Sequence, residues 1–200
     1  MRHLARYLEP AIQRALLGEV RAVIARAPLF TPTMPRTGKP FSVAMTNCGP
    51  LGWVSDKTGG YRYQETHPVT GKPWPAMPEL VSQIWRQLTD YPAAPEACLI
   101  NFYAPGARLG LHRDEDELDF AAPVISVSLG AAARFRMGGL KRRDPTESIM
   151  LGSGDVVILE GQSRLAYHGV DRILPGHDDL VEEGGRFNLT LRRVNPPDAT

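Results

Sequence analysis

The sequence predicts an α+β fold in which helices come first and a strand-rich half follows. The first segment repeats apolar residues at helical spacing, whereas the second half consists almost entirely of short runs of strand-like character. The 200 residues include 19 glycines and 18 prolines, above the roughly 12% that these two residues make up in average proteins. Turns are therefore frequent, and short strands between turns are typical of a sandwich, a jelly roll or a barrel.

The N-terminal segment is predicted to be helical. Apolar residues recur at every fourth position and so line one helix face: Leu4, Leu8, Ile12, Leu16, Val20 and Ile24. Pro10 either divides this segment or begins a second helix at its first position, and Pro28 ends it. A connector rich in proline, TPTMPRTGKP, follows over 31–40.

Beyond residue 40 the apolar spacing becomes that of strands. Phe41–Cys48 alternates as a strand does, and Tyr61–Gln64 is a candidate strand that pairs nearby. A helix is predicted to begin at Pro78 and to run through Leu88. Further strand-like runs cover 98–103, 123–129, 133–137, 147–151, 155–159 and 186–194. The sequence Gly-Ser-Gly-Asp at 152–155 is predicted to form a hairpin turn between two of these runs.

The composition excludes several classes of protein. With 42% hydrophobic and 22% charged residues, the chain is close to the globular average, which argues against a disordered, collagenous or membrane-spanning protein. No run of about 18 apolar residues occurs, and charged residues interrupt the N-terminal segment before a signal peptide could form. A net charge of +1 gives no global signature of nucleic-acid binding, so any such binding requires a local basic patch.

The cysteines indicate the compartment. Only Cys48 and Cys98 occur, without a CxxC motif, which fits a reducing compartment better than a disulfide framework. We therefore expect the protein in the cytoplasm. No long block of the sequence resembles another, so no internal repeat is expected, and since nothing in the sequence demands an oligomer, we expect a monomer.

The sharpest chemical feature is the sequence His112-Arg113-Asp114. In an extended segment, residues two apart project to the same face, so His112 and Asp114 can contact one metal ion. His168, beside another strand-like run, is the best candidate for a third ligand. Two imidazoles and one carboxylate with open coordination positions are the ligand set of non-heme Fe(II) oxygenases. The absence of thiolates from this set argues against a structural zinc site.

The His112-Arg113-Asp114 sequence can also be interpreted without a metal. An isolated HxD arises often by chance and is by itself weak evidence for a metal. The other histidines, His3, His67 and His177, have no comparable partner and are predicted to lie at the surface.

Two arginines near the C-terminus form a second constellation. Arg186 and Arg192 lie six residues apart, so both project to the same side of RFNLTLR, while the residues between them include an apolar face. Burying both with Asn188 in a core strand is costly without an anionic partner. A dicarboxylate supplies one, because guanidinium binds carboxylate through two hydrogen bonds. Read alone, the pattern also fits a solvated strand face.

Together these motifs resemble a known family. HRD, the distal His168 and RFNLTLR resemble the HxD…H…RxNxTxR signature of the AlkB family of Fe(II)- and 2-oxoglutarate-dependent dioxygenases, which act in DNA alkylation repair. The similarity extends to SVAMTNCGPLGW, GKPWPAMP, INFYAPGARLGLHRDEDE, PVISVSLG, GGLKRRDP and SRLAYHGV, and covers about residues 41–194. Such a set of spaced motifs is highly specific.

The resemblance implies a double-stranded β-helix (jelly-roll) core with N-terminal helices and a nucleotide-recognition lid. It implies one compact catalytic domain in three parts: a helical extension (1–40), the lid with its supporting helix (41–90) and the dioxygenase core (91–200).

The resemblance also implies roles for individual residues. The catalytic Fe(II) ligands are expected to be His112, Asp114 and His168. The co-substrate 2-oxoglutarate is expected to contact Asn101, Tyr103, Arg186, Asn188 and Arg192. In that set, Arg186 holds the distal carboxylate, and Arg192 and Asn101 engage the end that chelates iron. The nucleobase is expected to meet Met45, Trp53, Tyr61, Asp116 and Arg142.

The residues of the nucleobase set agree with these roles where their chemistry can be judged. Aromatic Trp53 and Tyr61 can stack a flipped base, although such residues are more often part of a core. A methylated adenine or cytosine is positively charged, so Asp116 would favour it over a normal base; otherwise Asp116 is one more solvated acid. Lys141-Arg142-Arg143 suits a phosphate contact, although such runs usually form solvated turns.

The implied reaction is oxidative demethylation of N1-methyladenine and N3-methylcytosine in single-stranded DNA, with RNA as a second substrate and with formaldehyde, succinate and CO2 as products. Two alternatives stay open: a dioxygenase that hydroxylates a protein or small metabolite, and a non-catalytic jelly-roll binding module. Three features depart from the family: longer stretches over 54–60 and 171–185, and Arg113 in place of a neutral side chain. They leave the lesion range open.

Overall fold

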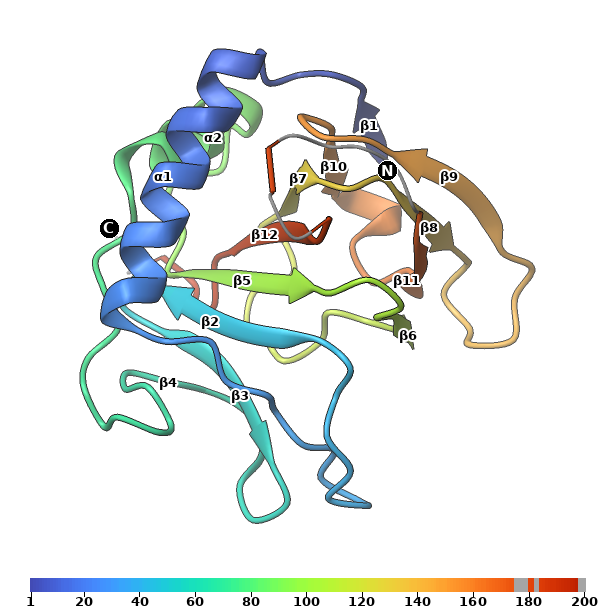
Figure 1. Cartoon of the computed structure of the whole chain (residues 1–200). Coiled ribbons are helices and arrows are strands. Elements are labelled where there is room, and N and C mark those ends of the chain that lie inside the picture. The colour runs from blue at the N-terminus through green and yellow to red at the C-terminus, as the bar shows by residue number, and fades with distance from the viewer. Residues whose placement is uncertain (175–179, 182–183, 198–200) are drawn as a thin grey trace.

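Two antiparallel sheets form the body of the protein (Figure 1), in a computed structural model that describes residues 1–174, 180–181 and 184–197. The six-stranded sheet has the order β1 (Arg2–Leu4), β10 (Val156–Leu159), β7 (Val124–Gly130), β12 (Arg186–Arg192), β5 (Ala97–Tyr103), β2 (Ala44–Cys48). The four-stranded sheet has the order β6 (Leu109–His112), β11 (His168–Ile173), β8 (Ala133–Met137), β9 (Glu147–Leu151). Two such sheets joined by crossing connections have the architecture of a jelly roll, as predicted.

Apolar side chains divide into two layers on either side of the six-stranded sheet. One layer lies between the two sheets and includes Leu99 of β5, Val157 of β10 and Phe135 of β8. The other lies between the six-stranded sheet and the helices, where Leu16 and Trp85 pack on the far side of β7 and β12. The alternation of β-strand side chains supplies both layers from the same strands. The helices therefore cover one face of this sheet and leave the other face to the cavity described below.

The first helix is shorter than the predicted helical segment. Helix α1 covers Pro10–Arg26, with Pro10 in its first turn, so the second of the two alternatives for this proline is the observed one. Residues Arg2–Leu4 are instead a strand, β1, that pairs with β10. A short N-terminal strand carries no periodic signal, because its partner lies more than 150 residues away in the sequence.

The buried face of α1 also differs from the predicted four-residue repeat. The helix buries Leu16, Leu17, Val20 and Val23, while Ile12 is 40% exposed. Four residues turn an α-helix by about 400°, so a strict four-residue repeat drifts by ~40° at each step and leaves the core face.

Helix α2 (Glu79–Leu88) confirms the prediction of a helix opening at Pro78, which is its N-cap residue. Its apolar side chains Val81, Ile84, Trp85 and Leu88 are buried. Proline before the first turn is favourable because its missing N–H would have no helical partner there.

The Gly-Ser-Gly-Asp segment does not form the predicted hairpin. Strand β9 before it pairs with β8 in the four-stranded sheet, whereas β10 after it pairs with β7 and β1 in the other sheet. The segment is thus a crossing between sheets. Its Asp155 carboxylate is fixed there by the Arg6 and Gly152 backbone N–H groups at 2.7 and 3.0 Å. Turn residues between two strands do not reveal which sheet each strand joins.

A separate two-stranded hairpin projects below the six-stranded sheet in Figure 1. Strands β3 (Gly52–Asp56) and β4 (Gly60–Gln64) pair with each other, so Tyr61–Gln64 is a strand as predicted while β3 was not predicted. The longer stretch expected after Trp53 is the turn of this hairpin, in which Asp56 accepts from the Thr58 and Gly59 N–H groups. The predicted strand Phe41–Cys48 is observed as the shorter β2.

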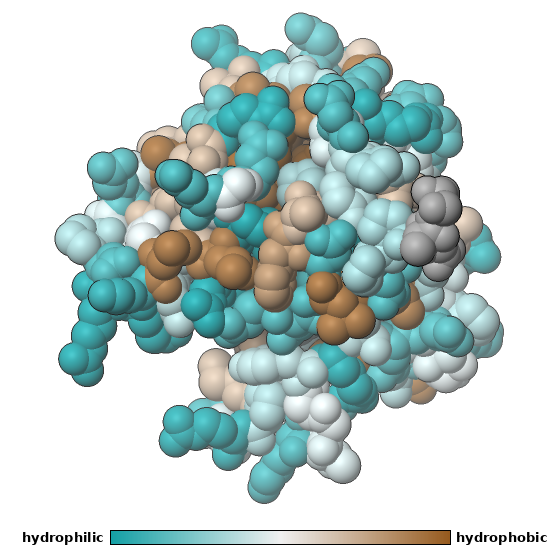
Figure 2. Space-filling view, turned by 180° about the vertical axis from the view of Figure 1, so that it is seen from behind, coloured by the Kyte–Doolittle hydropathy of each residue, from teal (hydrophilic) through white to brown (hydrophobic). Residues whose placement is uncertain are grey.

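The surface seen from behind is mostly hydrophilic, with apolar side chains in separate groups across its middle (Figure 2), as is normal for a folded protein. A helix long and apolar enough to cross a membrane is not found among the described residues. Both cysteines are buried and free. Most of the second longer stretch, over 171–185, and His177 with it, lies outside the described residues.

Gly169 tests the close approach of β6 to β11. A Cβ at this position would lie 2.6 Å from the Leu109 carbonyl oxygen and 2.8 Å from that of Gly110, whereas nothing lies within 4 Å of one at Gly152. We expect Gly169→Ala to lower the free energy of unfolding by roughly 1–3 kcal/mol, because backbone must move. Gly152→Ala, the control, should change it by less than about 1 kcal/mol. Urea unfolding of both variants checks this, and equal stabilities would contradict the close packing.

Candidate metal centre and the cavity around it

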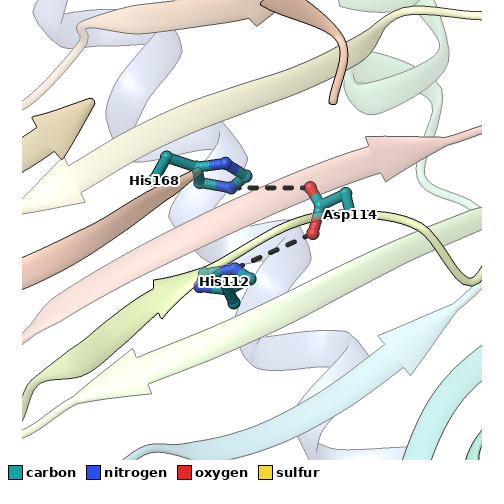
Figure 3. Close-up of side chains that lie close together, drawn as sticks. All are labelled: His112, Asp114 and His168. Carbon is teal, nitrogen blue, oxygen red and sulfur yellow. Dashed lines mark ion pairs between the residues drawn. The ribbon is translucent and has the colours of Figure 1, made fainter. Parts of the chain in front are cut away.

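The pairing of β6 with β11 brings two of the predicted ligands together. His112 ends β6, His168 begins β11, and the two residues are direct cross-strand partners. Asp114 follows β6 by two residues and turns its carboxylate toward both imidazoles (Figure 3). The Nε2 atoms of His112 and His168 each lie 3.7 Å from one of its oxygens, Oδ1 and Oδ2 respectively. One ligand atom of each residue lies within 4.8 Å of the others.

The second nitrogen of each imidazole is held by the backbone. Nδ1 of His112 lies 3.0 Å from the Gly110 carbonyl oxygen, and Nδ1 of His168 lies 3.0 Å from that of Ala166. A carbonyl oxygen only accepts, so we assign the ring proton to Nδ1 in both residues. The lone pair of each Nε2 is then free to bind a metal, which is the usual arrangement of metal-binding histidines.

The donor set and its unmet hydrogen bonds fit a divalent metal. Oδ2 of Asp114 is buried and has no hydrogen-bond partner among the described residues, although a buried carboxylate oxygen without one is costly. A cation between this carboxylate and the two Nε2 atoms would remove the cost. Two nitrogens and one oxygen, without a thiolate, are the donors of a non-heme Fe(II) centre with open positions.

The surroundings keep these ligands in the protonation state that a metal requires. Burial alone would raise the pKa of Asp114, but the Arg192 guanidinium and then the two imidazoles lower it well below the usual range. Burial, and secondarily His168, lowers the pKa of His112 to about 4. At neutral pH the carboxylate is therefore charged and the His112 imidazole is neutral, as metal binding needs.

Arg186 lines the same cavity as an unpaired buried cation. The residue is 1% exposed and lines the cavity, and its Nη2 donates to the Ser128 hydroxyl at 2.9 Å. Nε and Nη1 have no hydrogen-bond partner among the described residues. The guanidinium carbon lies 5.4 Å from the centre of the Tyr103 ring, and burial lowers the pKa of Arg186. Two free donors on a buried guanidinium fit a carboxylate ligand, and the solvated strand face considered for this arginine is wrong.

The other residues of the expected co-substrate set lie around Arg186 and line the cavity. Asn188 donates to the Ser126 hydroxyl at 2.7 Å and to the Val127 carbonyl oxygen at 3.1 Å. Asn101 donates to Asn188 at 3.4 Å, and its own Oδ1 has no partner among the described residues. Burial raises the pKa of Tyr103 to about 12, so its hydroxyl stays protonated and can donate.

Arg192 lies at the metal end of the cavity, bound to protein carboxylates. Its Nη2 donates to Oδ1 of Asp114 at 2.7 Å, and its Nη1 donates to Glu117 at 3.1 Å and to the Tyr63 hydroxyl at 3.0 Å. Its Nε has no partner among the described residues. Arg192 therefore orients a metal ligand directly, a contact that strand periodicity did not predict.

Aromatic side chains of the β3–β4 hairpin border the cavity. The Trp53 indole is buried, and the Tyr61 ring stacks on it with centroids 5.6 Å apart and planes 21° apart. Tyr61 is 52% exposed and is therefore not a core residue. Met45 of β2 lies in the same lining, 2% exposed.

Asp116 joins this hairpin to the metal-bearing segment. Its Oδ2 accepts a hydrogen bond of 2.7 Å from the Trp53 indole N–H, and its carboxylate lines the cavity. Burial raises the pKa of Asp116, while the indole hydrogen bond acts in the opposite direction. Asp116 is thus placed at the cavity wall rather than as a freely solvated acid.

A basic rim surrounds the Tyr167 ring at the cavity. The guanidinium carbons of Arg113 and Arg142 lie 5.4 and 5.9 Å from its centroid, within cation–π range. Arg142 is otherwise exposed and donates to the Leu111 carbonyl oxygen at 2.7 Å. Arg113, the unexpected cation between the HxD ligands, also forms an ion pair with Glu115. Arg113 and Arg142 therefore form a local basic patch beside the metal residues, which nucleic-acid binding by a chain of net charge +1 would require.

Sequence reasoning missed a buried group of charges behind Asp114. Glu117 and Arg164 are 3% and 2% exposed and form an ion pair of 3.1 Å, and Tyr63 donates to Glu117. Both residues lie in motifs that carry the family resemblance, Glu117 at the end of INFYAPGARLGLHRDEDE and Arg164 in SRLAYHGV, but neither has a predicted role. They differ from neighbouring charged residues only in being buried. Loop sequences have no regular apolar spacing from which such burial could be predicted.

Neither His3 nor His67 belongs to the metal site. His67 is 2% exposed, so its predicted surface position is wrong: its ring lies between the Pro28 carbonyl oxygen, at 2.7 Å, and the backbone N–H groups of the 69–70 turn. His3 is largely exposed but does have an acidic partner, Asp155, at 3.0 Å.

All three sets of residues face one cavity of about 910 Å³. The metal residues, the Arg186 guanidinium and the aromatic hairpin residues therefore share a single space. A cavity of this size is at the upper end of ligand pockets. It can hold a metal, a dicarboxylate and a planar group together.

Comparison with known proteins agrees with this arrangement. The sequence profile of the 2OG-Fe(II) oxygenase superfamily matches residues 1–192. The chain is 54% identical over 187 residues to an alpha-ketoglutarate-dependent dioxygenase AlkB homolog of Caulobacter vibrioides, covering 94% of this chain and 84% of that protein. It is 36% identical over 177 residues to the tRNA demethylase abh1 of Schizosaccharomyces pombe, covering 79% and 57%.

A solved structure is also similar. The structure of OsALKBH1 superposes with a TM-score of 0.79 at 32% identity, covering 96% of this chain and 95% of that one. The predicted oxygenase fold with a jelly-roll core is thereby confirmed.

Metal binding at the triad can be tested without any substrate. We expect His112→Ala to weaken binding of Mn²⁺ by at least roughly 100-fold, because one of three ligands is lost, while circular dichroism and unfolding stay close to those of the parent. His3→Ala, which removes a histidine paired with a carboxylate outside the cavity, is the control and should bind as the parent does. Isothermal titration calorimetry measures both, and undiminished binding by the His112 variant would remove the assignment.

Proposed function

The chain belongs to the 2OG-Fe(II) oxygenase superfamily and is an Fe(II)- and 2-oxoglutarate-dependent demethylase of alkylation repair; we propose that its substrates are N1-methyladenine and N3-methylcytosine in single-stranded DNA and in RNA. The observation that carries this proposal is the shared cavity. A metal triad, an unpaired buried guanidinium and a stacking indole with a carboxylate beside it all line it. The similarity to a tRNA demethylase favours a nucleic acid over other substrates.

In this proposal His112, Asp114 and His168 hold the metal. When bound, Fe(II) with 2-oxoglutarate and O2 supplies the oxidation that hydroxylates an N-methyl group, after which formaldehyde, the unmodified base, succinate and CO2 are released. Nδ1–H bonds to the backbone hold both imidazoles in place throughout. The triad leaves coordination positions open on the cavity side.

The second proposed role is the orientation of 2-oxoglutarate. Arg186 receives the distal carboxylate on its two free N–H groups, and the protonated Tyr103 hydroxyl and Asn188 lie beside it. The Asn101 amide oxygen and the Arg192 Nε–H, which have no hydrogen-bond partner among the described residues, are proposed to engage the end of 2-oxoglutarate that chelates the metal. A dicarboxylate held at both ends presents one orientation to the metal.

The third proposed role is recognition of the damaged base. Trp53, with Tyr61 and Met45 beside it, offers an apolar stacking surface for a base that has left its stack. The Asp116 carboxylate has a second oxygen beyond the one that binds Trp53, and this oxygen can accept the exocyclic amine. Its negative charge favours a methylated base, which is cationic. The lesion lies on the edge that pairing would hide, so single strands are preferred.

The rim supplies contacts to the backbone of the nucleic acid. Arg142 and Arg113 lie together over Tyr167 at the cavity, and Lys141 and Arg143 are exposed next to Arg142. Guanidinium groups at such a rim suit phosphate oxygens and fix register rather than sequence. We further propose that residues 1–40, 41–90 and 91–200 act as parts of one catalytic domain and that the protein works as a monomer in the cytoplasm, where its two free cysteines stay reduced.

A coupled assay tests the substrate class. Succinate release should rise with oligonucleotides that carry N1-methyladenine or N3-methylcytosine and should stay at the uncoupled level with peptides and small metabolites. Formaldehyde should appear in equal amount to succinate above that level. Coupling to peptides instead would establish the alternative, a protein hydroxylase, and no turnover of 2-oxoglutarate with Fe²⁺ and O2 would establish a binding module.

Arg186→Ala tests the co-substrate site. Loss of a buried charge-assisted pair is expected to raise the KM for 2-oxoglutarate roughly 30- to 1000-fold, equivalent to ~2–4 kcal/mol. The affinity for methylated oligonucleotide should change by less than about threefold, since Arg186 does not face the base in this proposal. The half-exposed Arg134 of β8, which does not line the cavity, provides the control as Arg134→Ala. Equal losses for both ligands would contradict the role.

Asp116→Asn tests the charge at the base site. The amide keeps an oxygen for the Trp53 indole but removes the negative charge that attracts a cationic base. We expect the KM for the N1-methyladenine oligonucleotide to rise about tenfold, or ~1.4 kcal/mol, with the KM for 2-oxoglutarate unchanged. Glu115→Gln removes the adjacent charge, which is paired with Arg113, and serves as the control. If both variants behave alike, Asp116 does not read the base.

A further inference from the structure

Glu117 is a buried carboxylate that the demethylation scheme above does not use. Its Oε1 accepts from the Tyr63 hydroxyl and from Nη1 of Arg192 at 3.1 Å, and its Oε2 accepts from Nη2 of Arg164 at 3.1 Å. These donors come from β4, from β12 and from the segment after η1 (Gly161–Ser163). One carboxylate therefore joins three elements that are far apart in the sequence.

The same bonds continue to the metal residue. Arg192, which binds Glu117 through Nη1, binds Oδ1 of Asp114 through Nη2 at 2.7 Å. Arg164, which binds the other oxygen of Glu117, donates to the Asp114 backbone carbonyl oxygen at 2.7 Å. Glu117 is thus linked through one arginine to the side chain of Asp114 and through another to its backbone.

The charges of this group balance only with Glu117 present. Arg164 and Arg192 supply two positive charges, and Asp114 and Glu117 supply two negative ones, all at most 6% exposed. Without Glu117, Arg192 would have Asp114 as its only anionic partner. The Asp114 carboxylate would then be drawn toward Arg192 and be less available to a metal.

At its other end the group holds the aromatic hairpin. Tyr63 lies directly opposite Trp53 in the β3–β4 register. Trp53 donates to Asp116 and Tyr63 donates to Glu117, so two paired hairpin residues bind two consecutive acidic residues. Asp116 is exposed to the cavity, while Glu117 is buried. The Asp116 bond is therefore open to competition by a ligand, and the Glu117 bond is not.

From this geometry we infer that Glu117 is a positioning residue that couples the β3–β4 hairpin to the metal site through the chain of bonds Tyr63–Glu117–Arg192–Asp114. A metal that fixes the Asp114 carboxylate also fixes Arg192, then Glu117, and then the strand that carries Tyr63. Its place in catalysis rests on the proposed function, because the hairpin is where the base is proposed to stack. The mechanical coupling itself requires only metal.

The first experiment measures that coupling with Mn²⁺ alone. Amide hydrogen exchange of residues 60–64 is compared in the full-length protein with and without saturating Mn²⁺. In the parent, the metal should slow this exchange by at least about fivefold, the lower end of usual coupling free energies. Tyr63→Phe removes only the hydroxyl, which donates to Glu117 and accepts from Nη1 of Arg192, and in this variant the ratio should fall below about twofold.

Tyr61→Phe is the matched control for the exchange measurement. It removes a hydroxyl from the same strand, but one that makes no hydrogen bond among the described residues, so the metal-dependent ratio should equal that of the parent. An unchanged ratio in Tyr63→Phe, or no slowing by Mn²⁺ in the parent, would overturn the inference. If Tyr63 had a purely structural role, Tyr63→Phe would accelerate exchange equally with and without Mn²⁺. The ratio would then stay unchanged, and this outcome would contradict the proposed coupling.

The second experiment tests the link between Glu117 and the metal ligand Asp114. Glu117→Gln keeps the size of the side chain but removes its charge, and Mn²⁺ affinity should fall roughly tenfold or more. Tyr63→Phe should lower Mn²⁺ affinity only about two- to fivefold, the factor by which the exchange ratio falls, because coupling free energies are reciprocal. Undiminished affinity in Glu117→Gln would overturn the link to Asp114. If this variant does not fold, the exchange ratio of Tyr63→Phe decides whether the bonds of Tyr63 to Glu117 and Arg192 couple the hairpin to the metal. None of these measurements involves demethylation, so their failure is distinguishable from a wrong substrate assignment.

Discussion

The antiparallel register between β6 and β11 is the constraint on which the site depends. It sets the last residue of one strand, His112, directly opposite the first residue of the other, His168, and so fixes both imidazoles before any ligand arrives. Gly169 allows this approach, because a side chain there would meet the backbone of β6. Asp114 completes the group from the chain that leaves β6. A site whose residues are held by two paired strands is rigid. In the proposed function this rigidity is needed to hold the metal in a fixed position relative to the N-methyl carbon.

Holding a charged carboxylate in the core creates the second requirement, a balanced set of buried charges. Asp114 is kept ionised chiefly by Arg192, and Arg192 in turn needs Glu117. Such groups give stability only when every member is satisfied. The few donors and acceptors that remain unsatisfied belong largely to residues that line the cavity, among them Arg186 and Asn101. Unsatisfied groups at these positions are the mark of a site prepared for polar ligands rather than of poor packing.

The fold separates stable and adaptable parts of the cavity. His168 and the proposed co-substrate residues are on strands that pair on both sides, β12 above all, and His112 ends the edge strand β6. Trp53 and Tyr61 are instead on a two-stranded hairpin at the periphery. The rim around Tyr167 is formed by loops. In the proposed function, substrate selection lies with peripheral elements, which vary in sequence more than a paired core strand does, and the unexpected Arg113 is located there.

The sequence by itself determined the strand-rich class, most strands, helix α2 and the identity of the metal and anion residues, since these depend on local spacing: HxD on one extended face and two arginines six residues apart. It left undecided where the chain changes sheets. The prediction of a hairpin at 152–155 and of a helix that includes part of β1 is wrong, because strand partners are chosen by distant residues. Burial was likewise decided only in three dimensions. Glu117 and His67 resemble solvated residues in the sequence, and only the packing of remote elements around them removes water and gives them fixed partners.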